Sequence, residues 1–129
     1  MGCFRPPRST GRPRALAFLV EQLTALLDRL APDVVVVETP FAARHLAAAL
    51  ALAETRGALL ATLGRWGGEV AEYAPARVKA AVVGYGRAEK QQVGYVVRQR
   101  LGLAEALPED AADALALALC HLAYATVPR

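Results

Sequence analysis

The chain has 129 residues, of which 55% are hydrophobic and 21% are charged, and its formal net charge is +3. These values exclude a disordered chain and are typical of one compact globular domain. We expect no membrane span, because charged residues interrupt the longest apolar stretches, and no secretory signal. Only two cysteines are present, Cys3 and Cys120, so we expect no disulfide framework and a cytoplasmic location.

Charge is unevenly distributed along the chain. The first fourteen residues carry four arginines and no acid, so the rest of the chain has a net charge of −1. Residues 77–100 hold six basic residues against one acid, and an acidic stretch from Glu105 to Asp113 follows. These two segments can pair with each other, and they can also form a phosphate-binding surface beside a metal site.

The N-terminal part predicts an irregular segment followed by a helix and a strand. Residues 1–14 are rich in proline and glycine and are expected to be irregular. Leucines at spacings of three and four predict a helix from about Ala15, which ends at Pro32. Four consecutive valines, residues 34–37, predict a short strand that is buried on both faces.

The rest of the chain predicts a long helix, a second strand and three shorter helices. The long helix should run from about Phe41 towards Trp66, with an interruption at Gly57. A strand is expected over Glu69–Tyr73. The first of the shorter helices should span Pro75 to about Val83, and the second should end near Leu101. The third should span Asp110 to about Tyr124. The class is α/β, with too few strands for a complete sheet.

Glu38 is the first candidate functional residue. An acid directly after four valines is costly if it is buried without a partner. At the carboxyl end of a buried strand, it occupies the place where open α/β sheets bind ligands. The alternative is a solvated strand end, or a carboxylate held by the next helix.

Asp110 and Asp113 form a second candidate. Pro108 fixes the helix start, and the spacing of three places both acids on one face of the first turn. Helix capping alone explains one such acid, whereas two also repel each other, and a cation relieves that repulsion. Together with Glu38 they form an oxygen-only set that suits Mg²⁺ or Mn²⁺, the ions used for phosphodiester hydrolysis. The spacing alone does not show that the three converge.

Basic and aromatic residues supply further candidates for DNA contact. Lys79 and Lys90 flank a Gly-x-Gly turn whose amides can meet phosphate, although an ordinary helix hairpin with a solvated basic face has the same pattern. Phe41 is either a core residue or a stacking platform for an unpaired base. Arg44 and His45 are weaker candidates for phosphate contact.

The last helix also contains a histidine. We interpret His121 as a packed or capping residue and not as a zinc ligand, because only Cys120 lies near it in the sequence.

Five sequence blocks occur in one order along roughly residues 15 to 125. They are Pro32-Asp33 with the four valines, Glu38 and Phe41; Thr55-Arg56-Gly57; Glu72-Tyr73; Val78-Lys79 through Val82-Val83-Gly84-x-Gly86 to Glu89-Lys90; and Asp110-Ala111-Ala112-Asp113-Ala114-Leu115-Ala116. On these blocks the chain resembles the RuvC family of Holliday junction resolvases. The last block and the Val-Val-Gly-x-Gly block are the most specific.

The resemblance implies an α/β fold of the RNase H-like type, in the ribonuclease H superfamily, with a mixed sheet flanked by helices. It implies a crossover junction endodeoxyribonuclease that works as a homodimer in recombination and repair. Such an enzyme nicks two strands of like polarity at a four-way DNA junction, with Mg²⁺ as cofactor and Mn²⁺ as the alternative. A branch-migration motor complex of RuvA and RuvB is the implied partner, and no membrane is involved.

The resemblance also implies roles for individual residues. Glu38, Asp110 and Asp113 match three of the family's four metal-binding carboxylates. Lys79 and Lys90 match basic residues near the scissile phosphate and complete the catalytic set. Phe41 matches an aromatic residue that approaches the junction bases, and the alanine- and leucine-rich helix after it matches the dimer interface. The DNA-binding set is Phe41, Arg44, Lys79, Arg87 and Lys90.

One departure from the family pattern concerns the start of the chain. The family begins with a strand that carries Asp-Pro-Gly, whereas this chain has no such motif and no acid before Glu21. We therefore expect residues 15–129 to form an incomplete RNase H-like domain, N-terminally truncated, after an irregular segment over residues 1–14. A misplaced start is the favoured explanation, ahead of a fragment or a degenerate copy. The competing function is a catalytically impaired junction-binding or interaction module, and an RNase H-like nuclease of another kind is a further alternative.

Overall fold

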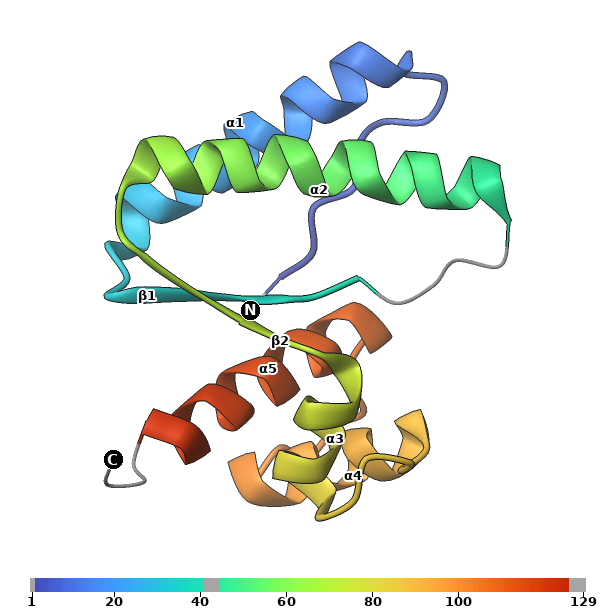
Figure 1. The fold of residues 1–129 in the computed structure, drawn as a ribbon, viewed down its shortest axis with the longest axis vertical. Coiled ribbons are helices and arrows are strands. Elements are labelled where there is room, and N and C mark those ends of the chain that lie inside the picture. The colour runs from blue at the N-terminus through green and yellow to red at the C-terminus, as the bar shows by residue number, and fades with distance from the viewer. Residues whose placement is uncertain (1, 41–44, 126–129) are drawn as a thin grey trace. The chain divides into compact units, whose positions relative to one another are not determined.

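The computed structural model describes residues 2–40 and 45–125 of the chain. Figure 1 shows its elements, which in chain order are α1 (Arg12–Leu30), β1 (Val34–Glu38), α2 (Leu46–Trp66), β2 (Glu69–Tyr73), α3 (Pro75–Val83), α4 (Lys90–Leu101) and α5 (Glu109–Ala125). Within this described part, β1 and β2 pair as a parallel two-stranded sheet. The predicted order of helices and strands is therefore confirmed.

The chain divides into two compact units. The helix-pair unit lies within residues 4–35 and 42–70 and contains α1 and α2. The three-helix unit lies within residues 1–3, 36–41 and 71–129 and contains α3, α4 and α5. Because Glu38 and both candidate lysines belong to the three-helix unit, the candidate site lies within a single unit.

In the helix-pair unit, α1 packs along α2 (Figure 1). The first helix begins at Arg12, slightly before the predicted start near Ala15. Pro13 in the first turn allows this, since the missing N–H of proline has no partner to lose there. Arg12 also forms an ion pair with Glu54 of α2. The helix ends at Leu30, ahead of Pro32, as predicted.

The second helix runs without a break through Gly57 and Gly64 to Trp66. The predicted interruption at Gly57 is therefore wrong. A helical glycine costs about 1 kcal/mol relative to alanine, and the surrounding alanines and leucines are strong helix formers that offset this cost. The helix ends at Gly67, whose left-handed backbone, with φ of 79°, glycine adopts without strain.

The start of α2 is capped by His45. Its Nδ1 accepts a hydrogen bond from the backbone N–H of Ala48 at 3.2 Å. This contact gives His45 a structural role, and the phosphate contact considered for it stays a prediction. The predicted helix start at Phe41 lies outside the described residues.

The surface of α2 is unusually apolar. Leu46, Leu50 and Leu52 are 74%, 54% and 47% exposed. By length and composition alone the helix could cross a membrane, with a mean hydropathy of 1.4 over 18 residues of which 11% are buried. The prediction that charged residues interrupt every long apolar stretch is therefore wrong, because the few charges of α2 leave one apolar window of 18 residues. One such helix does not by itself place the chain in a membrane.

The valines of β1 are half-buried. The prediction that this strand is buried on both faces is therefore wrong. Over the described residues the sheet contains only two strands, so β1 has a single paired neighbour. A strand in that position keeps more exposure than one in the centre of a wide parallel sheet.

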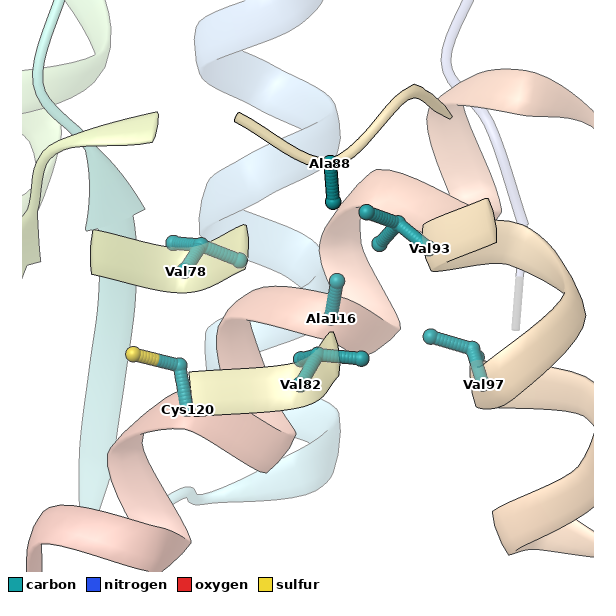
Figure 2. Close-up of a cluster of buried hydrophobic side chains, with 7 residues drawn as sticks. All are labelled: Val78, Val82, Ala88, Val93, Val97, Ala116 and Cys120. Carbon is teal, nitrogen blue, oxygen red and sulfur yellow. The ribbon is translucent and has the colours of Figure 1, made fainter. Parts of the chain in front are cut away.

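The core of the three-helix unit lies where α3, α4 and α5 pack against one another (Figure 2). Val97 of α4 and Cys120 of α5 are completely buried. The other buried members of the cluster are Val78, Val82, Ala88, Val93 and Ala116. Close packing of these small side chains holds the three helix axes near one another and fixes the start of each helix.

An aromatic group anchors the C-terminal end of α5. The Tyr73 hydroxyl lies 2.8 Å from Nδ1 of His121, and the Tyr73 ring stacks on Tyr124 at a centroid distance of 5.6 Å. The guanidinium of Arg77 lies 4.9 Å from the Tyr124 ring centroid. His121 is thus a packed residue, as the sequence predicts, and the group ties α5 to β2 and α3.

Candidate active site

Glu38 is the last residue of β1. The hydrogen bonding to β2 extends one residue further, because the N–H of Thr39 donates to the Tyr73 carbonyl at 2.9 Å. Partial loss of hydration raises the pKa of the Glu38 carboxyl, and the charge of Asp113 raises it further. Lys90 and Lys79 oppose this shift. Glu38 therefore shares one electrostatic environment with α5 and the two lysines.

The first two turns of α5 carry three acids, with Glu109 and Asp110 in the first turn and Asp113 in the second. The helix starts after Pro108, whose carbonyl accepts from the N–H of Ala112 at 3.0 Å. Asp110 is exposed, whereas Asp113 is half-buried. Burial is the largest effect on the Asp113 carboxyl and raises its pKa, with smaller contributions from Glu109 and Asp110. Lys90 and Lys79 again act in the opposite direction.

Lys90 is the first residue of α4 and reaches the acids of α5. Its Nζ lies 2.5 Å from Oε1 of Glu109 and 3.9 Å from Oδ2 of Asp113. The hydrogen bond that it donates to Glu109 raises the pKa of the ammonium, and the same contact lowers the pKa of the Glu109 carboxyl. A capping box between Glu89 and Gln92 fixes the start of the helix and hence the base of the lysine side chain.

The structure thus places four of the predicted site residues within electrostatic reach of one another: Glu38, Asp113, Lys79 and Lys90. Asp110 joins them through its effect on Asp113. Arg87 is exposed in the segment between α3 and α4. Phe41 and Arg44 lie outside the described residues.

Glu109 is a further candidate site residue, which the sequence did not single out. Its ion pair with Lys90 does realise one of the two outcomes predicted for the basic and acidic segments, which was internal pairing. The signal available in the sequence was an acid directly before Asp110, without a hydrophobic neighbour to bury it. Only the packing of α4 on α5 shows which base it meets.

Carboxylate oxygens are the ligand type that a hard divalent cation prefers, but few of them lie together here. Over residues 2–40 and 45–125, no group of three or more His, Cys, Asp and Glu side chains is close enough to hold a metal ion. Glu38 and Asp113 interact as a pair. Mg²⁺ is commonly held by one or two carboxylates, with water and substrate phosphate as its other ligands. Glu38 and Asp113 supply that number of carboxylates, and a cation would relieve the repulsion between them.

Comparison with known sequences gives one consistent match. The family model described as crossover junction endodeoxyribonuclease RuvC matches residues 1–121. Crossover junction endodeoxyribonuclease RuvC of Halorhodospira halophila is 45% identical over 127 residues, which cover 98% of this chain and 76% of the relative. The protein of the same name from Alkalilimnicola ehrlichii is 48% identical over 122 residues, or 94% of this chain and 73% of the relative.

Solved structures agree with the sequence match. Thermus thermophilus RuvC superposes with a TM-score of 0.82 at 34% identity, over 95% of this chain and 74% of that one. The same protein in complex with a Holliday junction substrate gives a TM-score of 0.86 at 34% identity, over 94% and 74% of the two chains. The RNase H-like fold expected from the resemblance is confirmed. The chain belongs to the RuvC family of crossover junction endodeoxyribonucleases.

Proposed function

We propose that this RuvC-family Holliday junction resolvase nicks two strands of like polarity at a four-way DNA junction by Mg²⁺-dependent phosphodiester hydrolysis. It would act in the cytoplasm, in homologous recombination and DNA repair. The observation that carries the proposal is the cluster formed by Glu38, Asp113, Lys79 and Lys90 in a chain of this family. Residues 15–129 are the proposed domain for this activity.

Glu38, Asp110 and Asp113 are the proposed metal ligands, with Mn²⁺ as the alternative ion. Glu38 and Asp113 already act on each other in this structure, and Asp110 is proposed to join them when the cation binds. When bound, the cation would supply charge neutralisation at the phosphate and an activated water. Half-burial of Asp113 supports this role, because a partly desolvated carboxylate gains more from a cation than a fully hydrated one does. Lys79 and Lys90 are the proposed catalytic cations that orient the scissile phosphate.

DNA contact is proposed for the basic residues near the lysines. Lys79, Arg87 and Lys90 belong to the basic segment between residues 77 and 100, whose charges suit phosphate oxygens. Phe41 and Arg44 complete the proposed DNA-binding set, with Phe41 stacking on a base at the junction centre. Binding should therefore weaken steeply as salt concentration rises.

A second copy of the chain is the proposed partner of α2. Its exposed leucines need cover in water, and an added Cβ at Gly57 or Gly64 meets nothing within 4 Å, so another helix can approach closely there. A homodimer would present two active sites to the two strands that are nicked. The branch-migration motor complex of RuvA and RuvB is the further proposed partner.

An electrophoretic assay of the 129-residue chain with a labelled four-way junction tests the proposal. We expect symmetric nicks in Mg²⁺ and none with a chelator. Linear duplex of the same sequence is the control substrate and should stay intact. Nicking that persists in chelator, or equal cutting of linear duplex, would contradict the proposal.

A junction-binding module without nuclease activity is the second candidate. It is favoured by the small carboxylate set, since the described residues contain no group of three metal-binding side chains. This candidate predicts a shifted junction band that is sensitive to salt, with no nicks in Mg²⁺. The same assay therefore separates the two functions.

A further inference from the structure

Lys90 is held by two acids of α5. Its Nζ lies 2.5 Å from Glu109 and 3.9 Å from Asp113. The three side chains keep 65%, 69% and 47% of their surface exposed, in the order Lys90, Glu109, Asp113. Water can therefore reach all of them, and the ion pairs can exchange without unfolding of the unit.

The contact is tertiary and is imposed by the core. Lys90 begins α4 and Glu109 begins α5, 19 positions further along the chain. The two helices pack through Val93, Val97 and Ala116, as Figure 2 shows, so the starts of both helices are fixed relative to one another. We call Glu109, Asp110 and Asp113 the acidic turn. The position of Lys90 beside the acidic turn is thus part of the fold of the three-helix unit.

The ammonium group of Lys90 partly neutralises the charge of the acidic turn. Glu109, Asp110 and Asp113 are like charges at the start of one helix, and Lys90 is the basic side chain that pairs with two of them. A divalent cation at Asp113 would bring a second positive charge close to the ammonium. Two neighbouring cations repel each other, so each weakens the binding of the other.

We propose that Lys90 is a displaceable internal counter-ion of the acidic turn, held by Glu109 beside Asp113 until a divalent cation binds and releases it towards a DNA phosphate. Glu109 is then a positioning residue for Lys90. The inference rests on the proposed metal-binding role of Asp113. Because linkage is reciprocal, removing the ammonium must strengthen cation binding by the same factor by which the cation weakens the Lys90 contact.

Binding of Mn²⁺ to the DNA-free protein, followed by electron paramagnetic resonance, tests the competition without any activity readout. We expect Lys90→Met to bind Mn²⁺ about two- to fivefold more tightly, the size of effect typical of an exposed ion pair. Lys79→Met is the matched control, because Lys79 acts on Asp113 less strongly than Lys90 does. It should change the affinity by less than about twofold.

The composition of the chain allows a direct view of the ammonium. Lys79 and Lys90 are the only lysines in the sequence, so ¹³C-lysine labelling gives two side-chain signals, which the two single variants assign. Addition of Mg²⁺ should shift the Lys90 signal saturably and the Lys79 signal much less. Glu109→Gln should move the Lys90 signal towards its Mg²⁺-bound position before any Mg²⁺ is added.

The outcomes distinguish failure of the counter-ion from failure of the metal site. If Asp113→Asn weakens Mn²⁺ binding while Lys90→Met leaves it unchanged or weaker, Lys90 is not a displaceable counter-ion, and Asp113 remains a metal ligand. If Asp113→Asn leaves Mn²⁺ binding unchanged, the metal site and the counter-ion both fail. Lys90→Gln serves as a second variant, and since Lys90 is exposed, a circular dichroism melt should show both variants folded.

Discussion

The two units of the chain use their apolar residues in opposite ways. The three-helix unit buries small apolar side chains, including Val97 and Cys120 at full burial, and gathers charge where α4 and α5 begin. The helix-pair unit buries Leu27 and Leu63 but leaves long apolar side chains such as Leu46 exposed on α2. The first pattern builds a fixed frame for charged groups, and the second leaves a surface for another molecule. Our proposal therefore places the chemistry in the three-helix unit and assembly with a second copy in the helix-pair unit.

The largest expected effect comes from a charge placed in the packed core of the three-helix unit. Val97→Asp buries a charge where no solvent reaches, which should lower the free energy of unfolding by at least about 4 kcal/mol. Tyr95→Asp, on the same helix but 62% exposed, should change it by less than about 0.5 kcal/mol. Chemical denaturation of both variants measures the difference, and equal stabilities would contradict the packing of α4 on α5.

The next effect concerns the assembly surface. Leu50→Lys places a charge on the exposed leucine face of α2, so the dimer dissociation constant should rise at least about tenfold. Leu101→Lys is the matched control, because this leucine is also exposed but belongs to the three-helix unit. Analytical ultracentrifugation at micromolar concentration measures the dimer dissociation constants of both variants. A wild-type chain that stays monomeric there would overturn the assembly role.

A smaller effect concerns the cost in stability of ionising Glu38 in the folded protein. The pKa of Glu38 is raised, so the folded state binds its proton more tightly than the unfolded chain does. Stability therefore falls as pH rises from the ordinary value near 4 through the raised one, and the loss persists at neutral pH. With chelator present, Glu38→Gln should raise the free energy of unfolding at about pH 7 by less than about 1 kcal/mol after solvent screening.

At about pH 3 the same substitution should have no effect, because the carboxyl is then protonated in both states. Thermal melts at the two pH values measure this difference. Glu105→Gln removes another exposed acid of the same unit and is the control. Destabilisation by Glu38→Gln at neutral pH would show instead that the ionised carboxylate supports the fold, and the raised pKa of Glu38 would then be wrong.

The smallest effect compares two helical glycines. An added Cβ at Gly57 in α2 or at Gly94 in α4 meets nothing within 4 Å. Each change to alanine should therefore stabilise the monomer by about 0.5–1 kcal/mol. If α2 is the assembly surface, Gly57→Ala should also weaken the dimer, whereas Gly94→Ala should not. Melting and sedimentation of both variants test this, and identical behaviour in both measurements would place Gly57 away from the interface.

Much of the fold was predictable because local signals were strong. Pro75 and Gly84 bracket α3 closely, and the strand predicted over Glu69–Tyr73 is confirmed. Errors arose where a local signal was weak or where tertiary context decides the outcome. Gly57 does not break α2, since a single glycine is too weak a signal against so many alanines and leucines. The burial of β1 depends on how many strands flank it, which four valines cannot reveal.

The site was predictable in its residue types but not in its pairings. The run of valines before Glu38 and the spacing of Asp110 and Asp113 mark the carboxylates without any coordinates. For Glu109 the sequence offered only its place directly before Asp110, and its partner Lys90 is set by the packing of two helices whose starts lie 19 positions apart. Long-range ion pairs between exposed side chains leave no periodic trace in a sequence.

The central claim is that the carboxylates of the three-helix unit carry metal-dependent cleavage of a four-way junction. Mapping nick positions on end-labelled strands in Mg²⁺, for the wild type, Asp113→Asn and Asp28→Asn, tests it most directly. We predict paired nicks at matching positions in two strands of like polarity, lowered at least about 100-fold by Asp113→Asn and unchanged by Asp28→Asn, which alters an exposed acid of α1. Paired nicks at the wild-type rate in Asp113→Asn would contradict the claim.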